Sequence, residues 1–106
     1  MYVERVNNDI TTFYSIDCDK FASAFSKSLK LSVIMNEDTI AVLKSFIGKV
    51  KYTNNYQNVD VRAKIILESK EGIKIELCTD GYKILINGRA TKPNEKFSTF
   101  INSLGN

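Results

Sequence analysis

Two pairs of neighbouring carboxylates are candidates for acid–base chemistry. Asp17 and Asp19 form one pair, and Glu37 and Asp38 form the other. Each pair stands where a helix is expected to begin, and acidic side chains there satisfy backbone N–H groups and the positive end of the helix dipole. We therefore interpret both pairs as helix-capping residues and predict that none of them is catalytic.

Histidine does not occur in the 106 residues, which excludes Ser-His and Cys-His nucleophile pairs and removes the commonest metal ligand. A zinc site would need Cys18 and Cys78 together with carboxylates, which is an unfavourable set. Two cysteines permit one disulfide, but we favour free buried thiols because cysteine often behaves as a small buried hydrophobe. The sequence thus predicts no enzymatic activity, no cofactor and no metal site.

A second kind of chemistry is recognition, and the uncharged stretch "YTNNYQN" (52–58) has the composition for it. Tyrosine offers rigid amphipathic area and asparagine offers adaptable hydrogen bonding, as in binding loops. The alternative is an ordinary connector whose tyrosines pack on the core.

The elements that must position these residues follow from apolar periodicity. Residues 9–16 alternate as a strand, and Phe21, Phe25 and Leu29 form a stripe typical of a helix that begins at Asp17 or Asp19. Residues 30–35 are either a short strand or a connector. Asn36 is expected to cap a helix over about 37–50, and Asn94 or Glu95 to open a last helix that ends near Leu104.

Residues 59–91 alternate as an antiparallel meander with turns at "SKEG", Asp80-Gly81 and Asn87-Gly88, the last two being type I′ signals. The predicted fold is α+β in a single domain over 1–106, with residues 1–8 as a flexible N-terminal segment. An antiparallel meander sheet of three to five strands would carry about three helices packed on one face.

The outward face of this meander mixes apolar and charged positions, which suits an interface with a polar rim. If the 68–72 turn is centred near 70, Lys64 faces Glu76 across the strands. The alternative is that isolated exposed apolar residues are ordinary, or that the N-terminal segment covers them. The face carries Ile66, Cys78, Leu85 and Ala90 with Arg62, Lys64, Lys74, Glu76 and Lys83.

We therefore expect a small protein-binding domain of inhibitor, immunity-like or adaptor type, whose partner is another protein or, as a homodimer, a second copy. The candidate interface residues are Tyr52, Tyr56, Arg62, Lys64, Ile66, Leu85 and Arg89. Two alternatives stay open: a nucleic-acid-binding module that uses the basic residues and tyrosines of the sheet, and a small-ligand pocket between sheet and helices. Acidic residues interrupt the basic field, and Tyr82 falls in the core-facing register, so nucleic acid is the weaker of these partners.

The layout of two helices followed by a meander, over about 18–91, resembles in outline small inhibitor and adaptor folds such as the β-lactamase-inhibitor type. The first strand and the last helix depart from that layout. The net charge of +3 is spread along the chain and gives no concentrated basic patch. No apolar run reaches the length of a membrane span, and the start has no apolar signal core, so we expect a cytoplasmic protein or an exported one whose signal was removed.

Overall fold

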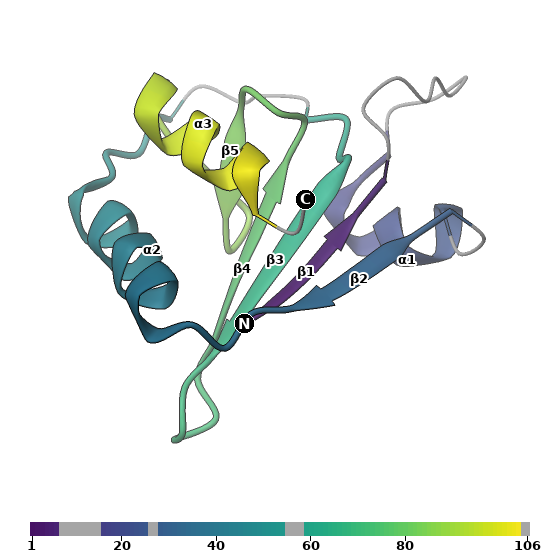
Figure 1. The fold of residues 1–106 in the computed structure, drawn as a ribbon. Helices are drawn as coiled ribbons and strands as arrows, with labels where there is room; N and C mark the ends of the chain where they lie inside the picture. The colour runs from purple at the N-terminus through teal and green to yellow at the C-terminus, as the bar shows by residue number, and fades with distance from the viewer. Residues whose placement is uncertain (7–15, 26–27, 55–58, 105–106) are drawn as a thin grey trace.

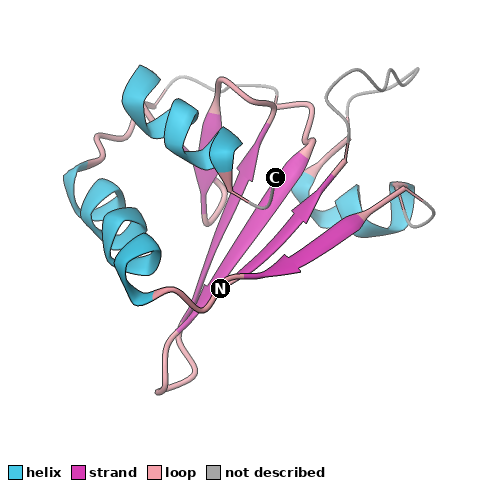
Figure 2. Ribbon diagram, in the orientation of Figure 1, coloured by secondary structure: helices cyan, strands magenta, loops and turns pink. Residues whose placement is uncertain are grey.

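One antiparallel sheet of six strands organises the chain in the computed structural model, which describes residues 1–6, 16–25, 28–54 and 59–104 (Figures 1 and 2). The strand order is β2-β1-β3-β4-β5-β6. The strands are β1 (Tyr2–Arg5), β2 (Lys30–Val33), β3 (Ala63–Glu68), β4 (Lys74–Thr79), β5 (Ile84–Ile86) and β6 (Arg89–Ala90). The helices are the 3-10 turn η1 (Cys18–Lys20), α1 (Phe21–Ala24), α2 (Glu37–Lys49) and α3 (Glu95–Ser103). The predicted α+β class is confirmed, with one strand more than the largest number expected.

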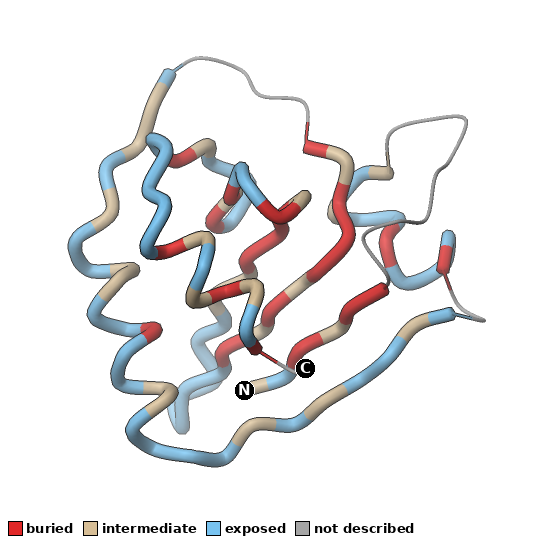
Figure 3. Tube along the Cα trace, turned by 45° about the horizontal axis from the view of Figure 1, so that its top comes forward, coloured by how far each residue is buried: buried red, intermediate tan, exposed pale blue. Residues whose placement is uncertain are grey.

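Helices α2 and α3 cover one face of the sheet, called here the helical face (Figure 1). Alternate strand residues such as Val3, Ile65 and Leu77 are fully buried in one cluster with Leu43 of α2 and Phe97 of α3. Figure 3 shows buried positions along the central strands and on both helices. The main core of the protein therefore lies between the sheet and these two helices.

Both helices begin where the sequence predicts. The Asn36 side chain accepts a hydrogen bond from the Thr39 amide at 3.0 Å, and the Asn94 side chain accepts one from the Phe97 amide at 3.1 Å. Glu37 and Asp38 lie in the first turn of α2, where their negative charge interacts favourably with the positive end of the helix dipole.

The opposite face carries η1 and α1, so the helices lie on both sides of the sheet. Phe21 and Phe25 are buried here with Cys78 of β4. The expected long helix is only two short turns, and Asp17, although it precedes η1, makes no side-chain cap hydrogen bond.

Cys18 and Cys78 form a disulfide, so the favoured prediction of free thiols was wrong. Cys78 points to this second face because its neighbour Leu77 points into the main core. The η1 turn brings Cys18 directly over it, with Cα atoms 5.8 Å apart. A pairing of residues that are 60 positions apart depends on the register of the whole sheet and cannot be seen in local patterns.

The prediction that residues 1–8 form a flexible segment was also wrong for its first part. Residues Tyr2–Arg5 are β1, which pairs with β2 on one side and β3 on the other. Arg5 is buried and donates to the carbonyl oxygens of Ile101 at 2.7 Å and Leu104 at 3.0 Å, at the end of α3, and its burial lowers the pKa of the guanidinium. The strand expected over 9–16 lies almost wholly outside the described residues, apart from Ile16, which is not in a strand.

Only one of the two predicted type I′ turns forms. Asn87 and Gly88 have φ angles of 49° and 81°, as a type I′ turn requires. Between β4 and β5 the chain instead makes a longer connection, in which Asp80 Oδ1 accepts hydrogen bonds from the amides of Tyr82 and Lys83, each at 2.8 Å. This shift takes Tyr82 out of the sheet and leaves it exposed.

Candidate binding surface

Four apolar side chains lie side by side on the second face of the sheet, beyond the area that α1 covers. The register places Tyr2 directly between Val33 of β2 and Ile66 of β3. Leu31 follows on the same side of β2. We call these four residues the open patch. Leu31 is 60% exposed, Val33 55% and Tyr2 43%, whereas Ile66 is half-buried.

Charged residues border the open patch. Glu4 stands between Leu31 and Lys64 in the register, and Lys64 Nζ lies 3.5 Å from Glu76 Oε2. The predicted Lys64–Glu76 pair therefore forms, but diagonally, because the register sets Lys64 opposite Cys78 and Ile66 opposite Glu76. The hairpin is centred one residue later than expected.

Glu4 supplies the most informative polar atom of this border. Among the described residues, its Oε2 is buried and accepts no hydrogen bond. A buried carboxylate oxygen without a donor is unfavourable, because it has lost water and gained nothing in exchange. Glu4 is therefore an incompletely hydrogen-bonded charged group at the border of the open patch.

Two of the predicted interface residues belong instead to the packing under α1. Arg62 is 6% exposed, donates to both carboxylate oxygens of Asp60 at 2.8 and 2.9 Å, and lies 5.2 Å from the Phe25 ring centroid. Leu85 packs on the same buried cluster. Their side chains hold the η1–α1 segment on the sheet.

Tyr52 and Arg89 lie at the far edge of the sheet, away from the open patch. The guanidinium carbon of Arg89 is 4.0 Å from the Tyr52 ring centroid. Tyr52 pairs with Thr91 beside β6 and packs against the main core, so its connector interpretation is supported. Tyr56 lies outside the described residues.

Of the predicted set, the structure thus brings Lys64 and Ile66 to the open patch and its border, places Arg62 and Leu85 under α1, and places Tyr52 and Arg89 together at the far edge. Sequence reasoning missed Tyr2, Leu31 and Val33. Leu31 and Val33 do alternate with Ser32, which is a strand signal, but their meeting with Tyr2 depends on the pairing of β1 with β2. Nothing local in the sequence indicates that pairing.

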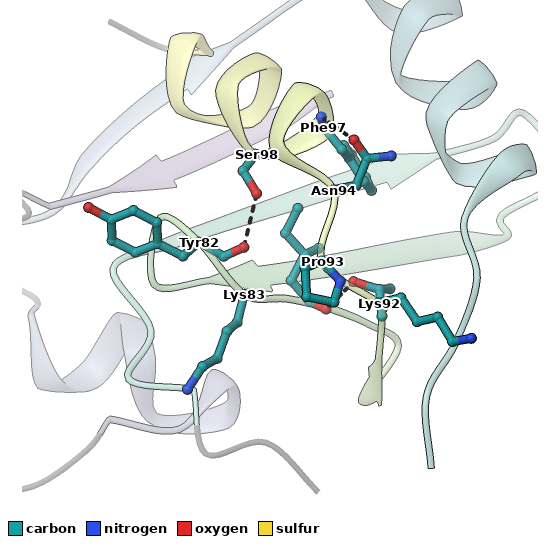
Figure 4. Close-up of a pocket in the computed structure, with 9 residues that line it drawn as sticks. Tyr82, Lys83, Lys92, Pro93, Asn94, Phe97 and Ser98 are labelled. Atoms are coloured by element: carbon teal, nitrogen blue, oxygen red, sulfur yellow. Dashed lines mark hydrogen bonds between the residues drawn. The ribbon is translucent and has the colours of Figure 1, made fainter. Parts of the chain in front are cut away.

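Two hollows border the helical face and bear on the small-ligand alternative. The larger, of about 310 Å³, lies between the end of α2 and the β3–β4 hairpin and is lined by Ile47, Gly48, Leu67, Ile73 and Ile75, among others. The smaller, of about 120 Å³, lies between the 80–83 connection and the start of α3 (Figure 4). There the Ser98 hydroxyl donates to the Tyr82 carbonyl at 2.9 Å and Asn94 caps α3, so these polar groups already serve the fold.

In the part of the chain that the structure describes, three side chains with possible metal-ligand atoms lie close together, namely Cys18, Glu76 and Cys78. Because the two sulfur atoms are joined in a disulfide, they do not offer thiolates to a metal. In this state the cluster has one carboxylate as its ligand. No helix within the described ranges has the length and apolar character to cross a membrane.

Comparisons with protein-family models, with curated proteins and with solved structures found no match. The outline resemblance over residues 18–91 therefore carries no argument about function, and the proposals below depend on the surface itself.

Proposed function

We propose that this chain is a small non-enzymatic protein-binding domain, of inhibitor, immunity-like or adaptor type, whose contact surface is the open patch. The observation that carries the proposal is the adjacent exposure of Tyr2, Leu31 and Val33 on one sheet face. Strand residues that face only water are expected to be polar. Contiguous exposed apolar side chains on such a face mark interaction sites.

The surroundings of the patch support the same proposal. Interfaces commonly have an apolar centre and a polar rim, with tyrosine among the residues that contribute most binding energy. Here Tyr2 is central and the rim holds Glu4, Lys64 and Glu76. The expected partner is a protein that presents an apolar centre and polar groups that match the charged rim of Glu4, Lys64 and Glu76.

A charge placed in the apolar centre tests this proposal. Ile66→Lys sets the new amine opposite Glu76, so it does not create a like-charge pair within the sheet. The matched control is Val42→Lys, which changes an exposed apolar residue on α2, across the sheet from the patch.

The partner is captured from extracts of the source cells on the immobilised wild-type chain, identified by mass spectrometry and titrated in purified form. We expect Ile66→Lys to weaken affinity at least tenfold, which corresponds to about 1.4 kcal/mol, and Val42→Lys to leave it unchanged. Equal affinity for all three folded proteins would refute the assignment of the open patch.

A nucleic-acid-binding role is the second candidate, favoured by one observation. Tyr82 is 83% exposed and lines the smaller hollow with Lys83 and Lys92 (Figure 4). An exposed aromatic ring with basic residues in the same region is a feature of surfaces that bind single-stranded nucleic acid, although the three side chains point away from one another in Figure 4. Titration with a single-stranded RNA at low and high salt separates the candidates, because phosphate contacts make affinity fall steeply with salt. Failure to bind at low salt would exclude this role.

The Cys18–Cys78 disulfide supports the exported alternative over the cytoplasmic one. Disulfides form and persist in oxidising compartments and are rare where thiols are kept reduced. Fractionation of the source cells with thiols trapped at lysis tests this. A protein recovered from the cytoplasm in reduced form would contradict it.

A further inference from the structure

Strand β2 is the last strand of the sheet, and no strand of the described residues pairs with its outer edge. Met1 and Ile34 exchange two hydrogen bonds, from the Ile34 amide at 2.8 Å and from the Met1 amino group at 3.2 Å. In an antiparallel ladder, hydrogen-bonded pairs alternate with pairs whose N–H and C=O groups point the other way. The backbone groups of Leu31 and Val33 therefore point away from β1 and towards the free edge.

The other edge of the sheet is protected, in contrast. Residues 51–53 run beside β6, where the Thr53 amide donates to the Ala90 carbonyl at 3.0 Å and the Lys92 amide donates to the Lys51 carbonyl at 2.8 Å. Unprotected edges are templates for strand addition, and proteins usually blunt them with charges, proline or bulges. β2 has one charge, Lys30, at its end, and apolar residues at both outward-bonding positions.

We propose that β2 pairs antiparallel with β2 of a second copy of this chain, about a twofold axis at Ser32. In this register Leu31 lies opposite Val33 of the second copy, and Val33 opposite its Leu31. Each is a hydrogen-bonded pair, so the four outward N–H and C=O groups on each strand edge are all satisfied. The two sheets become one continuous sheet.

The sequence of β2 favours a second copy over an unrelated strand because it is self-complementary in this register. Both bonded pairs join leucine to valine on the open-patch face, and cross-strand apolar pairs of this kind stabilise sheets. Lys30 lies opposite Ile34 of the second copy, so the only charge of the strand does not meet its own copy.

The contact is short, so the dimer is expected to be weak. Standard stable interfaces bury about 1,600 Å² in total, and two four-residue strands alone bury less than that. We expect dissociation in the micromolar range and a monomer at low concentration. The inference goes beyond the proposed function, because it uses the strand edge and leaves Tyr2 and Ile66 on the face free for a different partner.

Substitution of Ser32 by cysteine tests the register directly. Two Ser32 residues on the axis form a non-hydrogen-bonded pair with Cα atoms about 4.5 Å apart. That distance lies within the range of about 4.4–6.8 Å that a disulfide spans. The native cysteines are already joined to each other, so the new thiol is the one available. The matched control is Ser45→Cys, on an exposed position of α2.

Purified Ser32→Cys is oxidised with glutathione disulfide, which is reduced as the intermolecular bond forms. We expect a covalent dimer on non-reducing gels at least tenfold more abundant than for Ser45→Cys. Equal amounts for the two variants would overturn the register.

A second variant keeps the test valid if the cysteine variant misfolds. Leu31→Pro removes an outward N–H without removing a bond to β1, and proline is tolerated at such edge positions. In sedimentation velocity we expect a concentration-dependent shift towards dimer for the wild-type chain and for Ile66→Lys, and none for Leu31→Pro. A wild-type chain that stays monomeric up to about 500 µM, far above the micromolar dissociation expected for a short contact, would overturn the inference. Dimerisation of Ile66→Lys without partner binding would show that the two surfaces act separately.

Discussion

Reduction of the Cys18–Cys78 disulfide gives the largest stability change that we predict for this chain. The bond joins η1 to β4 across a sequence separation of 60 residues. In the chain-entropy description, a cross-link that closes a loop of this length restricts the unfolded chain by about 14 cal/mol/K, which is about 4 kcal/mol at 25 °C.

The folded state is expected to keep its packing after reduction. Cys78 is fully buried among Phe21, Phe25 and Val61, whereas Cys18 is only half-buried, so the Cys18 side chain can move outward to make room for two thiols. We therefore expect the free energy of unfolding to fall by about 2–4 kcal/mol, with the lower value arising if the reduced unfolded chain keeps residual structure.

The assay is urea denaturation followed by circular dichroism, with and without a phosphine reductant. The reduced protein should unfold at lower urea and with a steeper dependence on urea, because its unfolded chain exposes more surface. The double variant Cys18→Ala/Cys78→Ala serves as the control and should be insensitive to reductant. An unchanged unfolding midpoint, in a sample that mass spectrometry shows to be completely reduced, would contradict the predicted stabilisation by the disulfide.

Two further predictions concern the stability contributed by Tyr52, beside β6, and by Asn94, at the start of α3. Tyr52→Ala should lower the free energy of unfolding by about 2 kcal/mol in urea titrations, because the ring packs on the main core and under Arg89. Tyr52→Phe should keep the wild-type stability. Unchanged stability in the alanine variant would return Tyr52 to the candidate interface. Asn94→Ala should lower the free energy of unfolding by about 1 kcal/mol in thermal or urea unfolding, because it removes the cap of α3. The control is Asn54→Ala at an exposed position, which should leave stability unchanged. Equal stability of the two variants would contradict the capping role.

The elements that could be predicted from sequence are those whose signals are local. Helices α2 and α3 have an asparagine cap followed by a periodic apolar stripe, and both begin where those signals predict. The alternation of β3 and β4 and the Asn87-Gly88 turn are local in the same sense.

The elements that were missed depend on contacts between distant segments. β1 is four residues long and contains Arg5, and a charged residue in so short a segment does not indicate a buried strand. Arg5 is tolerated there because carbonyl groups at the end of α3 accept its hydrogen bonds. The η1–α1 segment is too short for helical periodicity to define. The disulfide to Cys78 and the burial of Phe21 and Phe25 with Val61 and Cys78 hold it on the sheet.

The residues of the candidate surface also fall into a group that local pattern predicts and a group whose exposure depends on distant segments. Ile66 and Lys64 follow from the alternation of one strand, which shows its outward residues without knowledge of its neighbours. Arg62 has the same alternation, yet Phe25 covers it, because a segment far away in the sequence folds over that end of the strand. The exposure of a sheet residue therefore depends on what crosses the sheet, which a strand pattern does not record.

Site-specific photo-crosslinking in the source cells tests most directly the claim that the open patch binds a protein. A benzophenone amino acid replaces Tyr2 in one variant and exposed Lys44 of α2 in a control. We expect a discrete protein adduct from position 2 that is missing from position 44 and is lost when Ile66→Lys is added. The same adducts from both positions, or none from position 2 in a folded variant, would contradict it.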